Sequence, residues 1–154
     1  MKSRGLLTDE HKSWIGHADT PVTVEISQRD IIKYSVATEQ TEEKFLSGKE
    51  APLMFIFNIF AEPRLVKDLR PDGLPRGNSN GPKLPLKRVM AGGTKVRNFR
   101  AIYPGDVLTG VNRIQDLYEK PGSKGPLIFT VRELEVTNQD GLPVFTETQT
   151  SIAR

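Results

Sequence analysis

The sequence predicts an α+β domain in which a long, curved antiparallel sheet wraps around one central buried helix. The first observation is the stretch from Lys87 to Arg154, where apolar and polar residues alternate in long runs, as in strands with one covered face. Turn residues separate these runs, for example at Asn138–Gly141. The second observation is the segment Leu53–Phe60, which is apolar nearly all round. Such a segment predicts a helix buried on most sides.

Length and composition limit the chemistry of the chain. Its 154 residues suit one domain with a single core. The absence of cysteine excludes disulfides, zinc–thiolate sites and a thiol nucleophile, and it fits a cytoplasmic protein. Two histidines without cysteine give no metal-ligand pattern, so no metal site is expected. The modest net charge of +3, without basic residues interleaved among exposed aromatics, argues against a nucleic-acid partner.

The first half of the chain predicts one strand and two helices. Ser27 is a predicted helix N-cap with Asp30 at the third helical position, a variant of the capping box. Pro52 pre-sets the first turn of the second helix. The longest apolar run is far shorter than the roughly 20 residues of a membrane span, so no membrane partner is expected. The predicted order is an arm (1–20) before one domain (21–154), with a strand (Val22–Ile26), a helix (Gln28 to about Thr38) and the buried helix (Leu53–Phe60).

The second half predicts a loop followed by the sheet. Residues 64–86 are rich in proline and glycine and predict a long surface loop, a candidate flap for a partner or substrate. Gly92-Gly93 predicts a bulge rather than a phosphate loop, because no helix follows it. The predicted strands are 88–91, 94–102, 107–119, 126–137 and 144–153. Several are about ten residues long, above the usual five to six, which suits a sheet that curls around a helix.

The order of short motifs resembles one known family. The matching pieces are Ala51-Pro52, Gly92-Gly93, Phe99-Arg100, Pro104-Gly105-Asp106, Gly122 with Gly125-Pro126, and Asn138-Gln139-Asp140-Gly141. In this order, from about Ile15 to the C-terminal residue, the chain resembles the MaoC-like or FAS1-like N-terminal dehydratase domains, which have the hot-dog fold. The resemblance implies acyl-CoA or acyl-carrier-protein thioesters as substrates and no cofactor.

The resemblance also implies an Asp/His pair just before Ala51-Pro52, and this chain departs from it there. Gln40 falls near the expected Asp, and no histidine follows in residues 39–50. An amide cannot accept a proton from water, so no catalytic residue is predicted, with Glu42 and Glu43 only as a fallback. The chain thus resembles the degenerate, non-catalytic subunit of heterodimeric (R)-specific hydratases. The expected partner is a second hot-dog chain that carries the Asp/His pair.

Substrate contacts are predicted in two places. Met54 and Phe57 are expected to line part of an acyl tunnel, and Arg97 and Arg100 to meet the phosphates of CoA. Two other functions stay open. The chain is alternatively a hot-dog thioesterase in which Glu42 or Glu43 activates water, or a homodimeric module that binds acyl-CoA without turnover.

Overall fold

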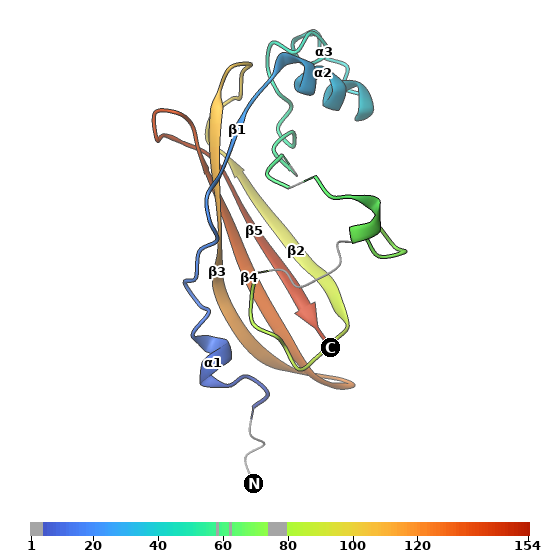
Figure 1. The fold of residues 1–154 in the computed structure, drawn as a ribbon, viewed down its shortest axis with the longest axis vertical. Helices are drawn as coiled ribbons and strands as arrows, with labels where there is room; N and C mark the ends of the chain where they lie inside the picture. The colour runs from blue at the N-terminus through green and yellow to red at the C-terminus, as the bar shows by residue number, and fades with distance from the viewer. Residues whose placement is uncertain (1–4, 58, 62, 74–79) are drawn as a thin grey trace.

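The computed structural model describes residues 5–57, 59–61, 63–73 and 80–154 (Figure 1). Long strands dominate, and the helices are short. In chain order the elements are α1 (Asp9–Lys12), β1 (Val22–Glu25), α2 (Gln28–Ala37), α3 (Glu43–Leu46), the 3-10 turn η1 (Val66–Asp68), β2 (Val89–Asn98), β3 (Val107–Gly122), β4 (Gly125–Thr137) and β5 (Pro143–Ala153). None of the helices in the described ranges is long and apolar enough to cross a membrane.

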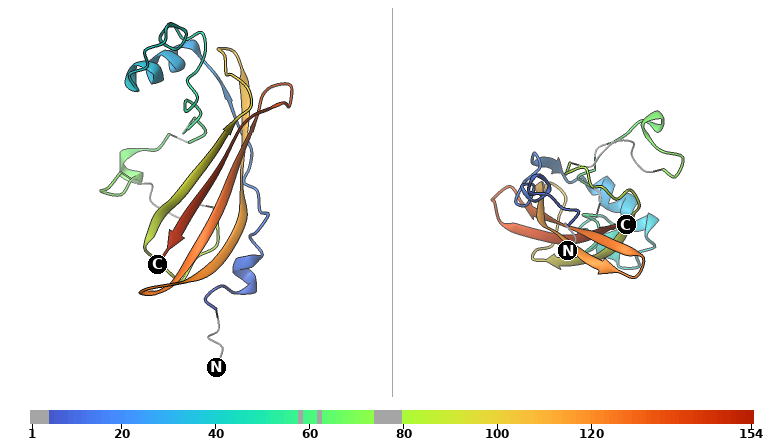
Figure 2. Two further views of the ribbon diagram at one scale, coloured as in Figure 1. Left: turned by 180° about the vertical axis from the view of Figure 1, so that it is seen from behind. Right: turned by 90° about the horizontal axis from the view of Figure 1, so that it is seen from below.

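All five strands form one antiparallel sheet in the order β1-β3-β4-β5-β2. The sheet is long and curved, with α2 and α3 gathered beyond one end and α1 and the C-terminal residue at the other (Figures 1 and 2). β2 bulges between Ala91 and Gly93, which confirms the predicted bulge and joins the two predicted strands 88–91 and 94–102 into one. β1 and β2 are the two edges of the sheet.

The first predicted helix is confirmed. α2 begins after Ser27, whose Oγ accepts the backbone N–H of Asp30 at 3.1 Å and donates to its carboxylate at 2.7 Å. The cap fixes the start of the helix because it satisfies one of the N–H groups that lack a partner in the first turn. Ile31 and Ser35, one helical turn apart, are the buried positions of α2, so the helix packs through one narrow stripe.

The second predicted helix is wrong in its secondary structure. The described residues of Leu53–Phe60 form successive turns, with N–H groups bonded three residues back, as from Phe57 to the carbonyl of Met54 at 3.1 Å. Phe55 and Ile56 are buried, whereas Leu53 is 66% exposed. Aromatic and β-branched side chains lose rotamer freedom in a helix, which costs free energy. Packing on all sides of the helix would offset this cost. In the isolated chain one side of the segment is open.

The core consists of two apolar clusters on the covered face of the sheet. One lies beside α2 and contains Ile31, Ile56, Leu108, Val136 and Phe145 among its buried members. The other lies toward α1 and contains Leu7, Leu117, Ile128 and Ala153. The strands between the two clusters carry polar side chains on the same face, and this polar band holds the candidate site.

Candidate functional site

The polar band crosses the middle of the covered face. Strand register places Asn112 opposite Leu134, and Leu134 opposite Glu147. The next row on the same face brings Arg132 opposite Gln149. A cavity of about 230 Å³ opens here between the sheet and the turns that follow Pro52, and it is lined by Ile56, Phe57, Phe60, Ala61, Asn112, Leu134, Glu147 and Gln149. The site is therefore apolar on the side of the turns and polar on the side of the sheet.

Gly110 allows the turns to approach the sheet at this point. The ring of Phe60 lies 3.0 Å from the position that a Cβ at Gly110 would occupy. Any side chain there would push the ring away, because real Cβ contacts are longer than this. The glycine therefore seats Phe60 at the rim of the cavity.

Glu147 is the chemically unusual group of the band. Its Oε1 atom is buried, and no residue in the described parts of the chain hydrogen-bonds to it. Burial raises the pKa of this carboxyl above its ordinary value, because desolvation disfavours the charged form. A carboxyl of this kind exchanges a proton closer to neutral pH than a surface glutamate, and such groups are candidates for function as well as for strain.

Arg132, in the polar band, contacts two segments that are distant from it in sequence. Its guanidinium lies 3.7 Å from the carboxylate of Asp19 in the N-terminal segment, and it donates a hydrogen bond to the carbonyl of Asn80. Both members of the ion pair are partly buried, at 21% and 22% side-chain exposure. The predicted loop 64–86, of which residues 74–79 lie outside the described residues, is thus anchored at Asn80 over the covered face.

Residues 39–50, where the family resemblance implies an Asp/His pair, do not bring their carboxylates together at a site. Gln40 donates from its amide Nε2 to the hydroxyl of Thr38 at 3.1 Å. Glu42 is exposed and lies 3.8 Å from the ammonium of Lys44, which also bonds Glu50 at 2.9 Å. Glu43 is exposed in the first turn of α3. These carboxylates therefore face solvent rather than the polar band.

The predicted substrate contacts divide between several places. Phe57 is 41% exposed and lines the cavity beside Glu147, and a second cavity beside Tyr34. Met54 is 39% exposed on the same turns. Arg100 donates to the carbonyl of Pro143 at 2.7 Å, and the guanidinium of Arg97 lies 5.9 Å from the ring centre of Phe99. Neither arginine lines the cavity that Phe57 and Glu147 line.

His11 lies in α1, at the opposite end of the sheet from α2 (Figure 1). It accepts the N–H of Thr8 at 3.0 Å, and its Nε2 lies 3.0 Å from the carbonyl of Lys83. His17 lies beside the middle of β3, where its carbonyl accepts the N–H of Ile114 at 3.0 Å, and its ring packs edge-on against Trp14 with 4.7 Å between ring centres. Neither imidazole lines the cavity beside Glu147. Among the residues that the structure describes, no group of three or more His, Asp or Glu is placed to hold a metal ion.

The sequence contained a signal for Glu147 that the prediction of the site did not use. Phe145 is fully buried on β5, and every second residue of a strand points to the same face. Glu147 and Gln149 must therefore point to the covered face with Phe145. A charged residue at a predicted inward position is the pattern that marks such a group.

Comparisons with solved structures identify the architecture. One chain of the C-terminally truncated HadBC (3R-hydroxyacyl-ACP dehydratase) complex from Mycobacterium tuberculosis is 16% identical, with 93% of this chain and 99% of that chain covered and a TM-score of 0.65. A chain of the ChsH1–ChsH2 complex of the same organism is 14% identical, with 94% of this chain and 91% of that chain covered and a TM-score of 0.63. The (R)-hydratase from A. caviae involved in PHA biosynthesis is 11% identical, with 89% of this chain and 94% of that chain covered and a TM-score of 0.56. At these identities the likeness shows the fold alone.

The class is therefore a hot-dog protein, as predicted, with turns in place of the expected central helix. The sequence matches the FAS1-like dehydratase domain region over residues 13–147, and the chain belongs to that family. The resemblance drawn from the motifs is confirmed by this match. No curated protein matches the chain.

Proposed function

We propose that this chain is the non-catalytic, substrate-shaping subunit of a heteromeric (R)-specific enoyl-CoA hydratase or 3-hydroxyacyl thioester dehydratase in the cytoplasm. A second hot-dog chain brings the Asp/His pair, and no cofactor takes part. The observation that carries the proposal is Gln40, which stands where the family resemblance puts an aspartate. Its side chain is engaged with Thr38, and no histidine occurs in residues 39–50. The Asp/His pair that the family resemblance implies is therefore missing from this interval.

The open side of the turns after Pro52 supports a role in shaping the substrate. Phe57 is 41% exposed and Leu53 66% exposed, and Phe57 borders two cavities. Exposed large apolar side chains that adjoin cavities are typical of surfaces covered by a ligand or a partner. An acyl chain lying against Phe57 and Phe60 would be held by contacts of this kind.

The free edge of the sheet supports a partner. β2 pairs only with β5, and nearly every residue of β2 is exposed. An uncovered edge strand presents unpaired N–H and C=O groups to another chain. Two of the structural neighbours, HadBC and ChsH1–ChsH2, are complexes of two different chains. We propose the same arrangement here, with the partner's edge strand on β2.

The test is hydration of a trans-2-enoyl-CoA, followed by loss of the enoyl absorbance. We expect no turnover by this chain alone, and turnover when it is co-expressed with a hot-dog chain that carries an Asp/His pair. The control is the partner alone with the same substrate, which should show lower kcat/KM or a shifted preference for acyl length. Turnover by this chain alone contradicts the proposal. Tight binding of acyl-CoA without turnover in either preparation supports the homodimeric binding module instead.

Glu147 favours one second candidate, a thioesterase. A single carboxylate with a raised pKa next to an apolar cavity is able to act as a general base on water beside a thioester. This candidate differs from the first in its product, because hydrolysis releases the free thiol of CoA. Thiol release from an acyl-CoA by the chain alone, lost in Glu147→Gln and kept in Glu43→Gln, would establish it. No thiol release in either protein rejects it.

A further inference from the structure

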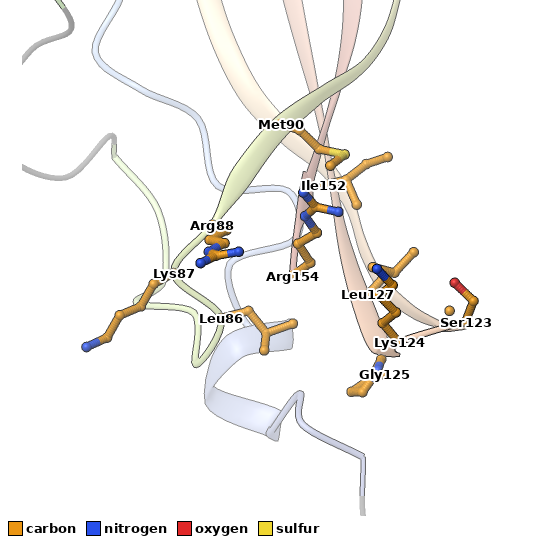
Figure 3. A pocket seen from close by; sticks show the side chains of 12 residues that line it. Leu86, Lys87, Arg88, Met90, Ser123, Lys124, Gly125, Leu127, Ile152 and Arg154 are labelled. Carbon is orange, nitrogen blue, oxygen red and sulfur yellow. The ribbon is translucent and has the colours of Figure 1, made fainter. Parts of the chain in front are cut away.

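A further cavity lies on the other face of the sheet, near the C-terminal residue. It measures about 790 Å³ and lies between the start of β2, the hairpin between β3 and β4, and the end of β5 (Figure 3). Register places Met90 opposite Ile152, and Ile152 opposite Phe129. The alternate residues Ile128 and Ala153 are buried in the core of the covered face. This cavity is thus separate from the one beside Glu147.

The floor of the cavity is apolar. Met90, Leu127 and Ile152 line it, and Met90 is 39% exposed. Beside this floor the rings of Tyr118 and Phe129 stack in parallel, with 5.0 Å between ring centres, and extend the apolar surface along β3 and β4. A surface of this kind buries the hydrocarbon part of a ligand.

Three cations surround the floor. Figure 3 shows the charged end of Arg154 beside Ile152 and that of Lys124 beside Leu127, with Arg88 on the other side of Arg154, whereas Lys87, which also lines the cavity, extends its ammonium away from them. The described side chains that line the cavity include no carboxylate. Within the described residues, none of these three cations takes part in an ion pair. The charged side chains that line the cavity are therefore all basic.

Arg88 and Arg154 stand directly opposite each other on neighbouring strands. The backbone N–H of each donates to the carbonyl of the other, at 3.1 and 2.8 Å. Like charges directly opposite in an antiparallel pair destabilise the sheet. An anion placed between the two guanidinium groups would remove this repulsion, and the planar fork of arginine suits the oxygens of phosphate or carboxylate.

From this arrangement we infer that the cavity binds a small amphiphilic anion, with a phosphate or carboxylate head between Arg88, Lys124 and Arg154 and a hydrocarbon part on Met90 and Ile152. The volume lies within the range of small-molecule sites, which are mostly apolar with a few polar groups that fix orientation. A solvated cluster of lysines and arginines would not need an apolar floor. The site shares no residue with the cavity beside Glu147. Met90 lies on β2, the strand on which the proposed partner pairs, so the binding experiment uses this chain without a partner.

The experiment is calorimetric titration of the full chain with octyl phosphate and with octanoate. Inorganic phosphate and octanol, each representing half of the ligand, serve as controls. We expect an amphiphilic anion to bind at least about tenfold more tightly than either half, since charge-assisted hydrogen bonds and the burial of methylenes both add to the affinity. The two heads distinguish a phosphate site from a carboxylate site. Equal binding of octanol and octyl phosphate overturns the inference.

Variants locate the site. Arg88→Gln and Lys124→Gln should each weaken binding about tenfold, and Met90→Gln should weaken octyl phosphate but leave inorganic phosphate unchanged. Lys87→Gln is the matched control, because it removes the same kind of charge from a side chain that points away, and it should change the affinity by less than about twofold. Equal losses in Lys87→Gln and Lys124→Gln would show only a general effect of net charge and would overturn the site. Binding to anionic vesicles alone, with no binding of monomeric octyl phosphate, would also overturn it.

Discussion

The two edges of the sheet differ in how they are covered. On the side of β1, the N-terminal segment continues the pairing along β3, since the N–H of Gly16 donates to the carbonyl of Ile114 at 2.7 Å and the N–H of Asp19 to that of Asn112 at 2.7 Å. Among the described residues, β1 and β2 both lack a further neighbour, but β1 has 4 residues whereas β2 has 10. Short edge strands are one way in which proteins protect an edge, so the long edge of β2 is the one more open to another chain.

The covered edge is also fastened by side chains. Asp19 and Arg132 join the N-terminal segment to the middle of the sheet, and Ala18 forms a bridge to Arg113. The open edge offers only exposed side chains such as Val89, at 66% exposure. The comparison therefore supports the proposal that a partner pairs with β2.

The largest expected effect comes from blocking the open edge. The N–H of Phe99 donates to the carbonyl of Val144, and the alternation of an antiparallel ladder then places the N–H of Thr94 on the outer side of β2. Thr94→Pro removes this donor without breaking the ladder to β5, as proline is tolerated at sheet edges. We expect loss of the complex with the Asp/His-bearing partner, with affinity reduced more than about tenfold.

Thr94→Ala is the matched control for this variant, and it should leave the complex intact. The measurement is sedimentation velocity of the co-expressed pair, with thermal unfolding of the isolated chain to show that each variant folds. A complex that forms equally well with Thr94→Pro would show that the partner does not pair with β2.

The next effect concerns the covered face. Gly110→Ala places a Cβ at 3.0 Å from the ring of Phe60, so the turns must move. Overpacking of this kind costs about 1–3 kcal/mol of the free energy of unfolding. The double variant Gly110→Ala with Phe60→Ala should lose less than the sum of the two single variants, because the clash is removed. Denaturant unfolding measures all three, and additive losses would contradict the contact.

A smaller effect is expected where the covered edge is fastened. Asp19→Asn removes one charge of the pair with Arg132 while leaving the hydrogen bond to Asn80. Since the pair is 3.7 Å apart and only partly buried, the loss should be about 0.5–1 kcal/mol. Hydrogen exchange should show faster opening of residues 16–19 in this variant. Asp140→Asn, at an exposed turn, is the control and should change neither quantity.

Local sequence patterns predicted some elements of the fold and not others. The strands, the capped helix and the bulge depend on local patterns of two to four residues, such as Ser27 with Asp30, and these predictions are confirmed. The conformation of Leu53–Phe60 was predicted wrongly. Its apolar composition predicts a helix that is covered on all sides, whereas one side of the segment is open in the single chain. The pairing of the N-terminal segment with β3 depends on contacts about one hundred residues apart, which no local pattern contains.

For the site, the sequence predicted no catalytic residue in this chain and an acyl tunnel lined by Met54 and Phe57. Phe57 lines a cavity, and its role toward a substrate stays a prediction. The roles of Met54, Arg97 and Arg100 stay predictions, as do those of Glu42 and Glu43. Glu147 was missed, although its spacing from Phe145 indicates the covered face. What could not be predicted is that its carboxylate lacks a described partner, because that depends on the exact packing of the turns.

The smallest effect is expected from Glu147→Gln, and its sign depends on pH. Burial holds the pKa of this carboxyl above its unfolded value, so the folded state binds its proton more tightly and gains stability at low pH. That gain is lost as the pH rises through the raised pKa, where the folded state must desolvate a charge. Glutamine never ionises, so the variant should be slightly more stable than the parent at pH 7, and the difference should vanish below about pH 4. Thermal unfolding from pH 3.5 to 8 measures this, with Glu133→Gln, on the other face of the sheet, as the control.

A variant that is less stable at pH 7 would mean that the carboxylate has a partner in the folded chain, and the case for a free, functional carboxyl would fail. A more stable variant that also loses the activity of the complex would show that the chain keeps an unfavourable carboxylate because the site uses it.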